Sequence, residues 1–263
     1  MRIRHPAVAG RFYSQSQAQL QQQLTNWLSE KSHFEQPIRA LIVPHAGYTF
    51  SGEVAAKAYQ YLGELANKIN KVILIGPSHR HYFKGCALPA ADYFETPLGK
   101  VRIDTQSIEK LREIEDIEVS EQVHALEHCL EVQLPFLQAC LHDFTLIPLI
   151  TSNVSPAKVA TLIDTLWQGD NCLLIISSDL SHFHSYSEAQ TIDNHTCSLI
   201  ERYEPSLTPE QACGSTGINT LLLMAKKRGY QLTRIALINS GDTVAGDKER
   251  VVGYVSYLIS EPE

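Results

Sequence analysis

Several features that mark particular classes of protein are missing from this sequence of 263 residues. No apolar run approaches the roughly 18–20 residues that a bilayer-spanning helix needs. The chain starts with basic residues, but Gly10 and Arg11 interrupt the stretch that follows, and a Gln-rich stretch comes next, so no signal-peptide pattern is present. We therefore expect a cytoplasmic protein with no membrane partner.

Positive charge and paired cysteines are also scarce. Lysine and arginine total 22 against 29 acidic residues, a net charge of −7, and the two signs are interspersed. This balance argues against nucleic acid as a partner, because such binding needs clustered positive charge. The six cysteines include no C-x-x-C pair, and in a chain of this length they do not resemble a secreted disulfide framework.

Apolar residues make up 44% of the chain, enough to bury a core without disulfide or metal staples. Short β-branched runs alternate with longer amphipathic stretches, which predicts an α/β fold with a central mixed β-sheet flanked by helices. The expected strands are 40–43, 71–75, 85–88, 101–103, 144–150, 172–177, 234–238 and 251–259. The expected helices are 15–29, 52–61, 105–115, 125–140, 156–167, 187–201 and 215–228. With no linker or repeat in the sequence, we expect one domain over residues 1–263.

Histidines gather just after three of the expected strands. They are His45 after the first strand, His79 and His81 after the second, and His182 and His184, with Asp179, after 172–177. Ligands of open α/β sheets bind at the carboxyl ends of strands, and neutral imidazole is a common metal ligand and acid–base group. A single histidine in such a place is more often a hydrogen-bonded structural residue, but three such segments favour a convergent polar site.

A fourth segment adds two glutamates and two histidines. At helical spacing, Glu127 and Glu131 share a face, as do His124 and His128. The three-residue step from His128 to Glu131 also resembles the spacing of carboxylate metal sites. An amphipathic helix with a solvated acidic face explains the same spacing equally well. We therefore treat Glu127, His128 and Glu131 as residues that contact the metal ligands or the substrate.

Cys213 differs from the other cysteines because it directly precedes a Gly- and Ser-rich helix start. Backbone N–H groups and the helix dipole are expected to lower its pKa there, which favours a thiolate that acts as nucleophile or metal ligand. The others are expected to be inert core thiols: Cys86, Cys129, Cys140, Cys172 and Cys197. Asp242, in a loop after a late strand, either closes the site or belongs to a simple turn. We group it with His81 among the candidate substrate contacts.

These residues make the chain resemble the Memo family, also called AmmeMemoRadiSam system protein B. Five motifs in order carry the resemblance: Pro44-His-Ala-Gly-Tyr48, Gly76-Pro-Ser-His79, Glu127-His128, Ser177-Ser-Asp-Leu-Ser-His182 and Ala212-Cys-Gly214. The resemblance implies a fold similar to class III extradiol ring-cleaving dioxygenases. It also implies metal ligands at His45, His79 and Cys213, with Asp179 and His182 close by. The extradiol enzymes use two histidines and a carboxylate for iron, so a thiolate at the third position departs from their pattern and widens the choice of metal to copper or zinc.

Three functions follow as hypotheses. The first is a redox-active metal protein that holds iron(II) or copper, in preference to zinc, with His182 as acid–base group and Asp179 as an orienting or proton-accepting group. The second is a non-catalytic cleft that recognises a peptide or a protein partner. The third is a hydrolase in which Cys213 attacks with the help of His182 and Asp179, or in which zinc-bound water attacks. The expected ligand of the cleft is a small molecule or a peptide.

Overall fold

A mixed β-sheet runs through the centre of the protein, in the computed structural model that describes residues 1–30 and 32–263. Within these residues the strands are β1 (Ile3–Arg4), β2 (Ile38–Val43), β3 (Lys71–Pro77), β4 (Gly85–Leu88), β5 (Tyr93–Thr96), β6 (Gly99–Ile103), β7 (Ile117–Val119), β8 (Thr145–Ser152), β9 (Cys172–Ser177), β10 (His182–His184), β11 (Gln231–Asn239) and β12 (Val251–Ser260). Their order is β1-β5-β6-β8-β3-β9-β2-β12-β10, with β11 beside β12, and β4 beside β7 and β8.

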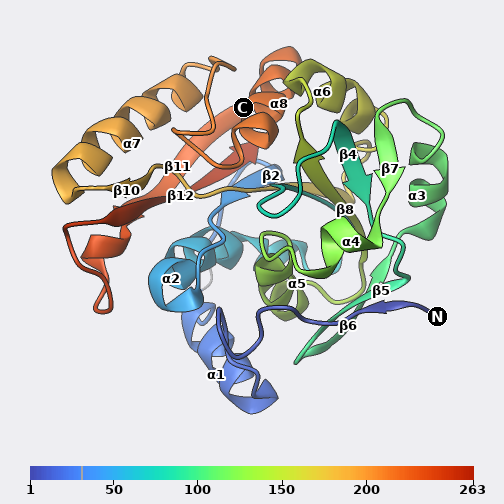
Figure 1. Ribbon diagram of the computed structural model, residues 1–263, viewed down its shortest axis with the longest axis horizontal. Helices are drawn as coiled ribbons and strands as arrows, with labels where there is room; N and C mark the ends of the chain where they lie inside the picture. Colours follow the sequence, from blue (N-terminus) through green and yellow to red (C-terminus); the bar gives the residue numbers. More distant parts are fainter. Residues whose placement is uncertain (31) are drawn as a thin grey trace.

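Helices cover both faces of this sheet. They are α1 (Gln17–Trp27), α2 (Tyr48–Tyr59), α3 (Thr105–Leu111), α4 (Glu121–Ala125), α5 (Leu134–Cys140), α6 (Pro156–Asp164), α7 (Tyr186–Glu201) and α8 (Ser215–Arg228), with 3₁₀ turns η1 (Gln60–Leu65), η2 (Glu131–Gln133) and η3 (Ser240–Asp242). Figure 1 shows α6, α7 and α8 on one side of the sheet and α1, α2 and α5 on the other. The predicted mixed sheet flanked by helices is confirmed. None of the helices in the described ranges is long and apolar enough to cross a bilayer.

Three neighbouring parallel strands, β3, β9 and β2, form the middle of the sheet. Val43 of β2 pairs with Ser177 of β9, and Ile75 of β3 pairs with Ile176. All six residues of β2 and of β9 are buried, as expected for parallel strands covered on both faces. The in-register pairing places the segments that follow the three strands at one edge of the sheet.

The prediction of a single helix at 125–140 is wrong. The chain instead forms α4, an irregular turn, η2 and α5. Arg4 donates from Nε to the carbonyl oxygen of His124 and from Nη2 to that of Glu127. The N–H of His128, which would bond to the His124 carbonyl in a helix, donates to the Glu127 carboxylate. These competing hydrogen bonds interrupt the helix, so the predicted sharing of helix faces does not occur.

Other boundaries also differ from expectation. The helix expected at 52–61 begins earlier, as α2, and the helix expected at 105–115 ends earlier, as α3. The strands β1, β5, β7 and β10 were not predicted, because two to four residues are too few to show a clear alternation. The helix expected at 215–228 is confirmed as α8, and Gly229 caps its C-terminal end with a left-handed φ of 70°.

Truncating a central core side chain tests this packing. Ile73 of β3 is fully buried in the main apolar cluster, so Ile73→Ala is expected to lower the free energy of unfolding by roughly 2–5 kcal/mol. Urea denaturation followed by circular dichroism measures the loss. Ile114, which is 44% exposed, provides the matched control, because Ile114→Ala should change stability by only about 0.5 kcal/mol. Equal losses in the two variants would contradict the placement of Ile73.

Candidate metal centre

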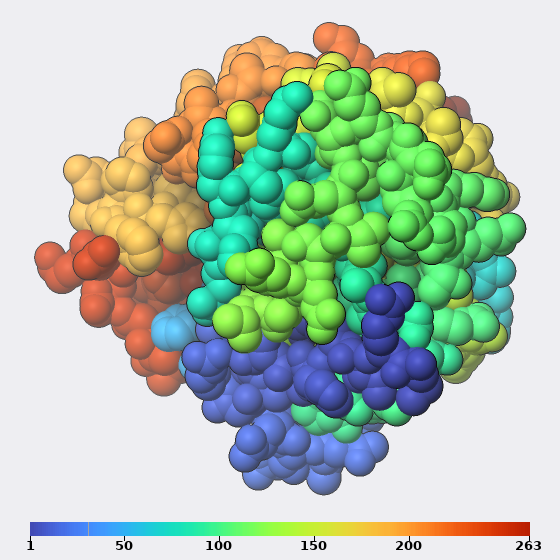
Figure 2. Space-filling view, turned by 45° about the vertical axis from the view of Figure 1, so that its right-hand side comes forward, coloured from blue at the N-terminus to red at the C-terminus, as the bar shows by residue number. Residues whose placement is uncertain are grey.

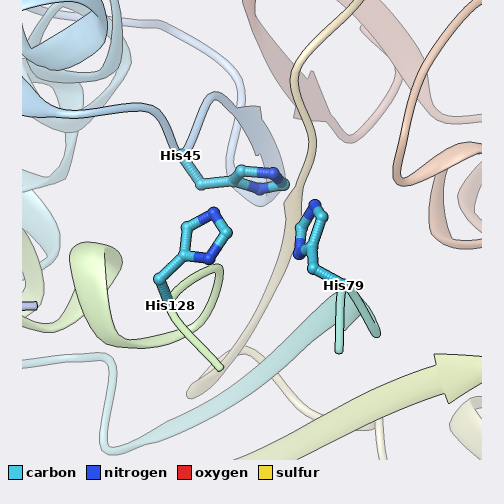
Figure 3. A group of neighbouring side chains, drawn as sticks. All are labelled: His45, His79 and His128. Carbon is cyan, nitrogen blue, oxygen red and sulfur yellow. The ribbon is translucent and has the colours of Figure 1, made fainter. Parts of the chain in front are cut away.

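Three imidazole rings meet at the carboxyl ends of β2 and β3 (Figure 3). His45 follows β2, His79 follows β3, and His128 lies in the turn before η2. One ring nitrogen from each lies within 4.8 Å of the other two. Imidazole nitrogens bind a metal such as zinc at about 2.0–2.1 Å, so nitrogens this close can share one ion once the rings move toward it.

His45 is fixed by contacts on every side. Its backbone N–H donates to Asp179 Oδ1 at 2.8 Å, and its Nδ1 lies 3.0 Å from Ser177 Oγ. Its Nε2 faces the Cys213 sulfur at 3.2 Å. Burial, followed by the nearby His79, lowers the pKa of His45 well below its usual value. A neutral ring is the form that binds a metal.

His79 is oriented by the carboxylate of Glu127. Glu127 Oε1 lies 2.8 Å from His79 Nδ1, and Oε2 accepts the backbone N–H of His79 at 2.7 Å. Burial raises the pKa of Glu127, but the hydrogen bonds and the charge of His79 outweigh it and hold that pKa at about 2. An ionised Glu127 accepts the Nδ1 proton of His79 and thereby leaves Nε2 for a ligand. Glu127 thus contacts one of the two histidines predicted as ligands.

His128 belongs to the compact histidine group, although the sequence predicted it only as a neighbour of the ligands. Its ring centroid lies 4.6 Å from that of His79 and 5.4 Å from that of His45. Burial, then the proximity of His45, lowers the pKa of His128 to about 4. The Phe12 ring packs against it at 4.9 Å, which shields one side of the group.

Cys213 lies beside this group and makes its contact through His45. Its sulfur also accepts the backbone N–H of Asp179 at 3.3 Å. The expected lowering of its pKa is wrong: burial, followed by the Asp179 carboxyl, raises the pKa of the Cys213 thiol to about 12. The low dielectric around the sulfur outweighs the backbone N–H groups near the start of α8. The five other cysteines are buried, as predicted.

Asp179 and His182 leave the carboxyl end of β9 together but have different surroundings. Asp179 is buried and holds the backbone of His45, and burial raises its pKa. His182 is half-buried at the start of β10, and in the described parts of the chain no hydrogen bond joins its ring to His45, His79 or Cys213. Its predicted acid–base role stays a prediction.

The two predicted substrate contacts on loops lie in turns. The backbone of His81 exchanges hydrogen bonds with Ser78 Oγ, and its ring is half-buried. Asp242 is exposed, accepts the Tyr186 hydroxyl at 2.6 Å and caps the backbone N–H of Asn239 at 2.9 Å. These contacts give Asp242 the role of fixing its own loop.

Glu131 has a structural task. The interpretation that Glu131 belongs to a solvated acidic face is wrong, because Glu131 is fully buried. It forms an ion pair with Arg4 and accepts the N–H groups of Ala7 and Val8 and the hydroxyl of Tyr13, the last at 2.7 Å. Figure 2 shows the N-terminal segment, in blue, lying against the green middle of the chain. The hydrogen bonds and the ion pair of Glu131 hold that segment close to His128.

Two polar residues that frame the site were not predicted. Arg4 carries no sequence signal beyond being one of the basic residues at the start of the chain. Gln133 is fully buried and donates to Pro44 O at 2.8 Å and to Ser177 Oγ at 2.9 Å. The available signal was an amide within the largely apolar segment that follows Glu131, from Val132 to Phe136, because a buried polar group must find partners.

Comparison with known proteins decides the family. The family described as Memo-like protein matches residues 4–258. The chain belongs to the Memo family. A MEMO1 family protein of Sulfolobus acidocaldarius is 33% identical over 281 residues, which cover 97% of this chain and 98% of the relative. A MEMO1 family protein of Methanosarcina mazei is 32% identical over 274 residues, covering 98% and 100% respectively.

A solved structure supports the fold of this Memo-family chain. An uncharacterized protein from Escherichia coli K12 superposes with a TM-score of 0.50 at 13% sequence identity. The match covers 83% of this chain and 99% of the other. At this identity the likeness concerns the fold alone.

A buried histidine next to the site makes stability depend on pH. His124 Nε2 lies 2.9 Å from Ala87 O, and burial lowers the pKa of His124 to about 4, partly offset by that carbonyl. In the unfolded chain the pKa is about 6.5, so the unfolded state takes up a proton first as the pH falls. We expect His124 to reduce the free energy of unfolding by up to roughly 3 kcal/mol between about pH 6.5 and 4.

Chemical denaturation at a series of pH values measures this effect. His124→Gln should remove that part of the pH dependence, whereas a change at the exposed His195, His195→Gln, serves as the control. If His124→Gln and the wild type lost stability in parallel as the pH falls, the burial of a neutral His124 would be wrong.

Proposed function

We propose that the protein binds iron(II) or copper through His45, His79 and Cys213, with His128 as a further nitrogen donor, and uses the metal to oxidise a small molecule. One observation carries the proposal: ring nitrogens of the three histidines lie within 4.8 Å of one another. The Cys213 sulfur, 3.2 Å from His45 Nε2, adds a fourth donor beside them. Imidazole and thiolate ligands suit iron, copper and zinc rather than magnesium or calcium.

The residues around the group fit a metal. His79 has its Nδ1 engaged by Glu127 and His45 has its Nδ1 engaged by Ser177, so both can offer Nε2. Such outer contacts fix ring orientation and tautomer at metal sites. A bound iron or copper ion supplies electron-transfer chemistry that the side chains themselves lack. The protein's own residues orient the ligands, and Phe12 keeps water from one side of His128.

The hydrolase hypothesis has weaker support. A nucleophilic cysteine needs a thiolate, but without a metal, burial raises the pKa of Cys213 to about 12. A bound metal ion would itself deprotonate a coordinating thiol, so this obstacle applies to the metal-free nucleophile and not to the ligand. Its sulfur contacts the ring of His45, whereas the hypothesis paired it with His182.

Recognition of a peptide or protein partner is the second candidate. Three large apolar side chains close in sequence to site residues are exposed: Tyr82, Leu126 and, in β10, Phe183. Exposed apolar side chains favour contact with an apolar segment of a partner where they lie together on the surface. In this alternative the cleft binds without a metal, so the experiment below separates the two candidates.

Metal analysis tests the proposed function. Protein purified without oxygen and without added metal, then offered iron(II) or copper(I), is expected to retain one equivalent. His45→Ala and Cys213→Ala remove a ligand, so each should weaken binding by more than the roughly 10–100-fold typical of outer contacts. His195→Ala, at an exposed position, controls for adventitious binding by surface histidines. Wild-type protein that retains no more metal than either ligand variant would refute metal binding at this site.

Oxygen uptake tests the catalytic part. Metal-loaded wild type, given a panel of catechols and thiols, is expected to consume oxygen faster than His45→Ala treated in the same way. A stoichiometric metal with no uptake across the panel would leave recognition as the better account of the cleft.

A further inference from the structure

We infer that Ser177 is a positioning residue that holds the proton of His45 on Nδ1, so that Nε2 faces the metal site with a free lone pair. The inference rests on the proposed metal binding at His45 but adds the group that prepares the ligand. Ser177 is the last residue of β9 and is fully buried. It belongs to neither the predicted ligands nor the predicted catalytic residues.

Ser177 Oγ has three polar neighbours, and their chemistry determines where its hydrogen points. The carbonyl oxygen of Cys129, 2.7 Å away, can only accept. The Nε2 of Gln133, 2.9 Å away, can only donate. The Nδ1 of His45, 3.0 Å away, can do either.

The amide of Gln133 has a fixed orientation. Its Nε2 lies 2.8 Å from the carbonyl oxygen of Pro44, which accepts only. Its Oε1 accepts the hydroxyl of Tyr59 at 3.0 Å, and burial raises the pKa of Tyr59 well above its usual value, so this hydroxyl stays a donor. Both N–H bonds of Gln133 are therefore directed outward, one to Pro44 and one to Ser177.

The single hydrogen of Ser177 must then point at Cys129 O. If it pointed at His45 instead, two oxygen acceptors would face each other at 2.7 Å in the interior with no hydrogen between them, which is strongly unfavourable. With its hydrogen used and one lone pair taken by Gln133, Ser177 has one lone pair left. His45 Nδ1–H donates to it.

The same hydroxyl also links the segments that bear two of the histidines. Gln133 holds Pro44, next to His45, and Ser177 holds the carbonyl of Cys129, next to His128.

The ring of His45 is only 1% exposed, so solvent does not compete for its Nδ1. Tautomer and ring position are therefore set before any metal arrives.

Nitrogen-15 NMR of the metal-free protein with labelled histidine tests the assignment directly. The signal missing from His45→Gln identifies the ring. We expect the Nδ1–H tautomer in the wild type and in Ser177→Thr, which keeps a hydroxyl. In Ser177→Ala a substantial Nε2–H population is expected, because Nε2–H can then donate to the Cys213 sulfur. An Nε2–H tautomer in the wild type would overturn the inference and needs no variant to fold.

A matched control separates this role from a general loss of packing. Ser256 is also fully buried, and among the described residues its hydroxyl has no hydrogen-bond partner. Ser256→Ala should leave the His45 tautomer unchanged, and Ser177→Ala with an unchanged tautomer would contradict the assignment. Cobalt(II), added as a spectroscopic probe, is expected to bind Ser177→Ala about 10–100-fold more weakly than Ser256→Ala. If the wild type bound neither cobalt(II), iron(II) nor copper(I), the proposed function would fail, whereas an Nδ1–H signal would still support the role of Ser177.

Discussion

The parallel pairing of β3, β9 and β2 is the constraint on which the rest of the site depends. Because Val43 pairs with Ser177 and Ile75 with Ile176, the chain leaves all three strands at the same edge of the sheet. This places the residues that follow the strands close together: His45, His79 and Asp179. Side chains on both faces of these strands are packed in the core, so a slip of register would disrupt this close packing.

Buried hydrogen bonds fix the orientation of the histidine rings that the strand ends bring together. Glu127 holds His79 and the turn that carries His128, while Ser177 holds His45. Each of these polar groups is satisfied, which the interior requires. The Glu131 carboxylate accepts hydrogen bonds from the N-terminal segment. The position of the turn next to His128 therefore depends on residues from the start of the chain.

The sequence allowed the sheet and the strand-end histidines to be predicted because both follow from local patterns. Apolar runs mark buried strands, and a polar residue directly after such a run must lie at the strand end. The helix expected at 125–140 failed for a non-local reason: its carbonyl groups bond to Arg4, more than a hundred residues away. The prediction of a lowered pKa for Cys213 failed because burial depends on the folded chain. Burial raises this pKa by more than the nearby helix start lowers it.

The membership of His128 in the donor group also depends on tertiary structure. Sequence spacing placed it on a helix face with His124, but the interrupted helix sends the two rings to different partners, His124 to Ala87 O and His128 to the other histidines. Gln133 illustrates the same limit, since its role requires Pro44 and Ser177 from two strand ends.

X-ray absorption spectroscopy of the anaerobically loaded protein tests the central claim most directly, because it counts the atoms bound to the metal. The account predicts imidazole scattering from His45, His79 and His128 together with one sulfur neighbour that disappears in Cys213→Ala. A metal surrounded only by oxygen, or one whose spectrum is the same in wild type and Cys213→Ala, would contradict it.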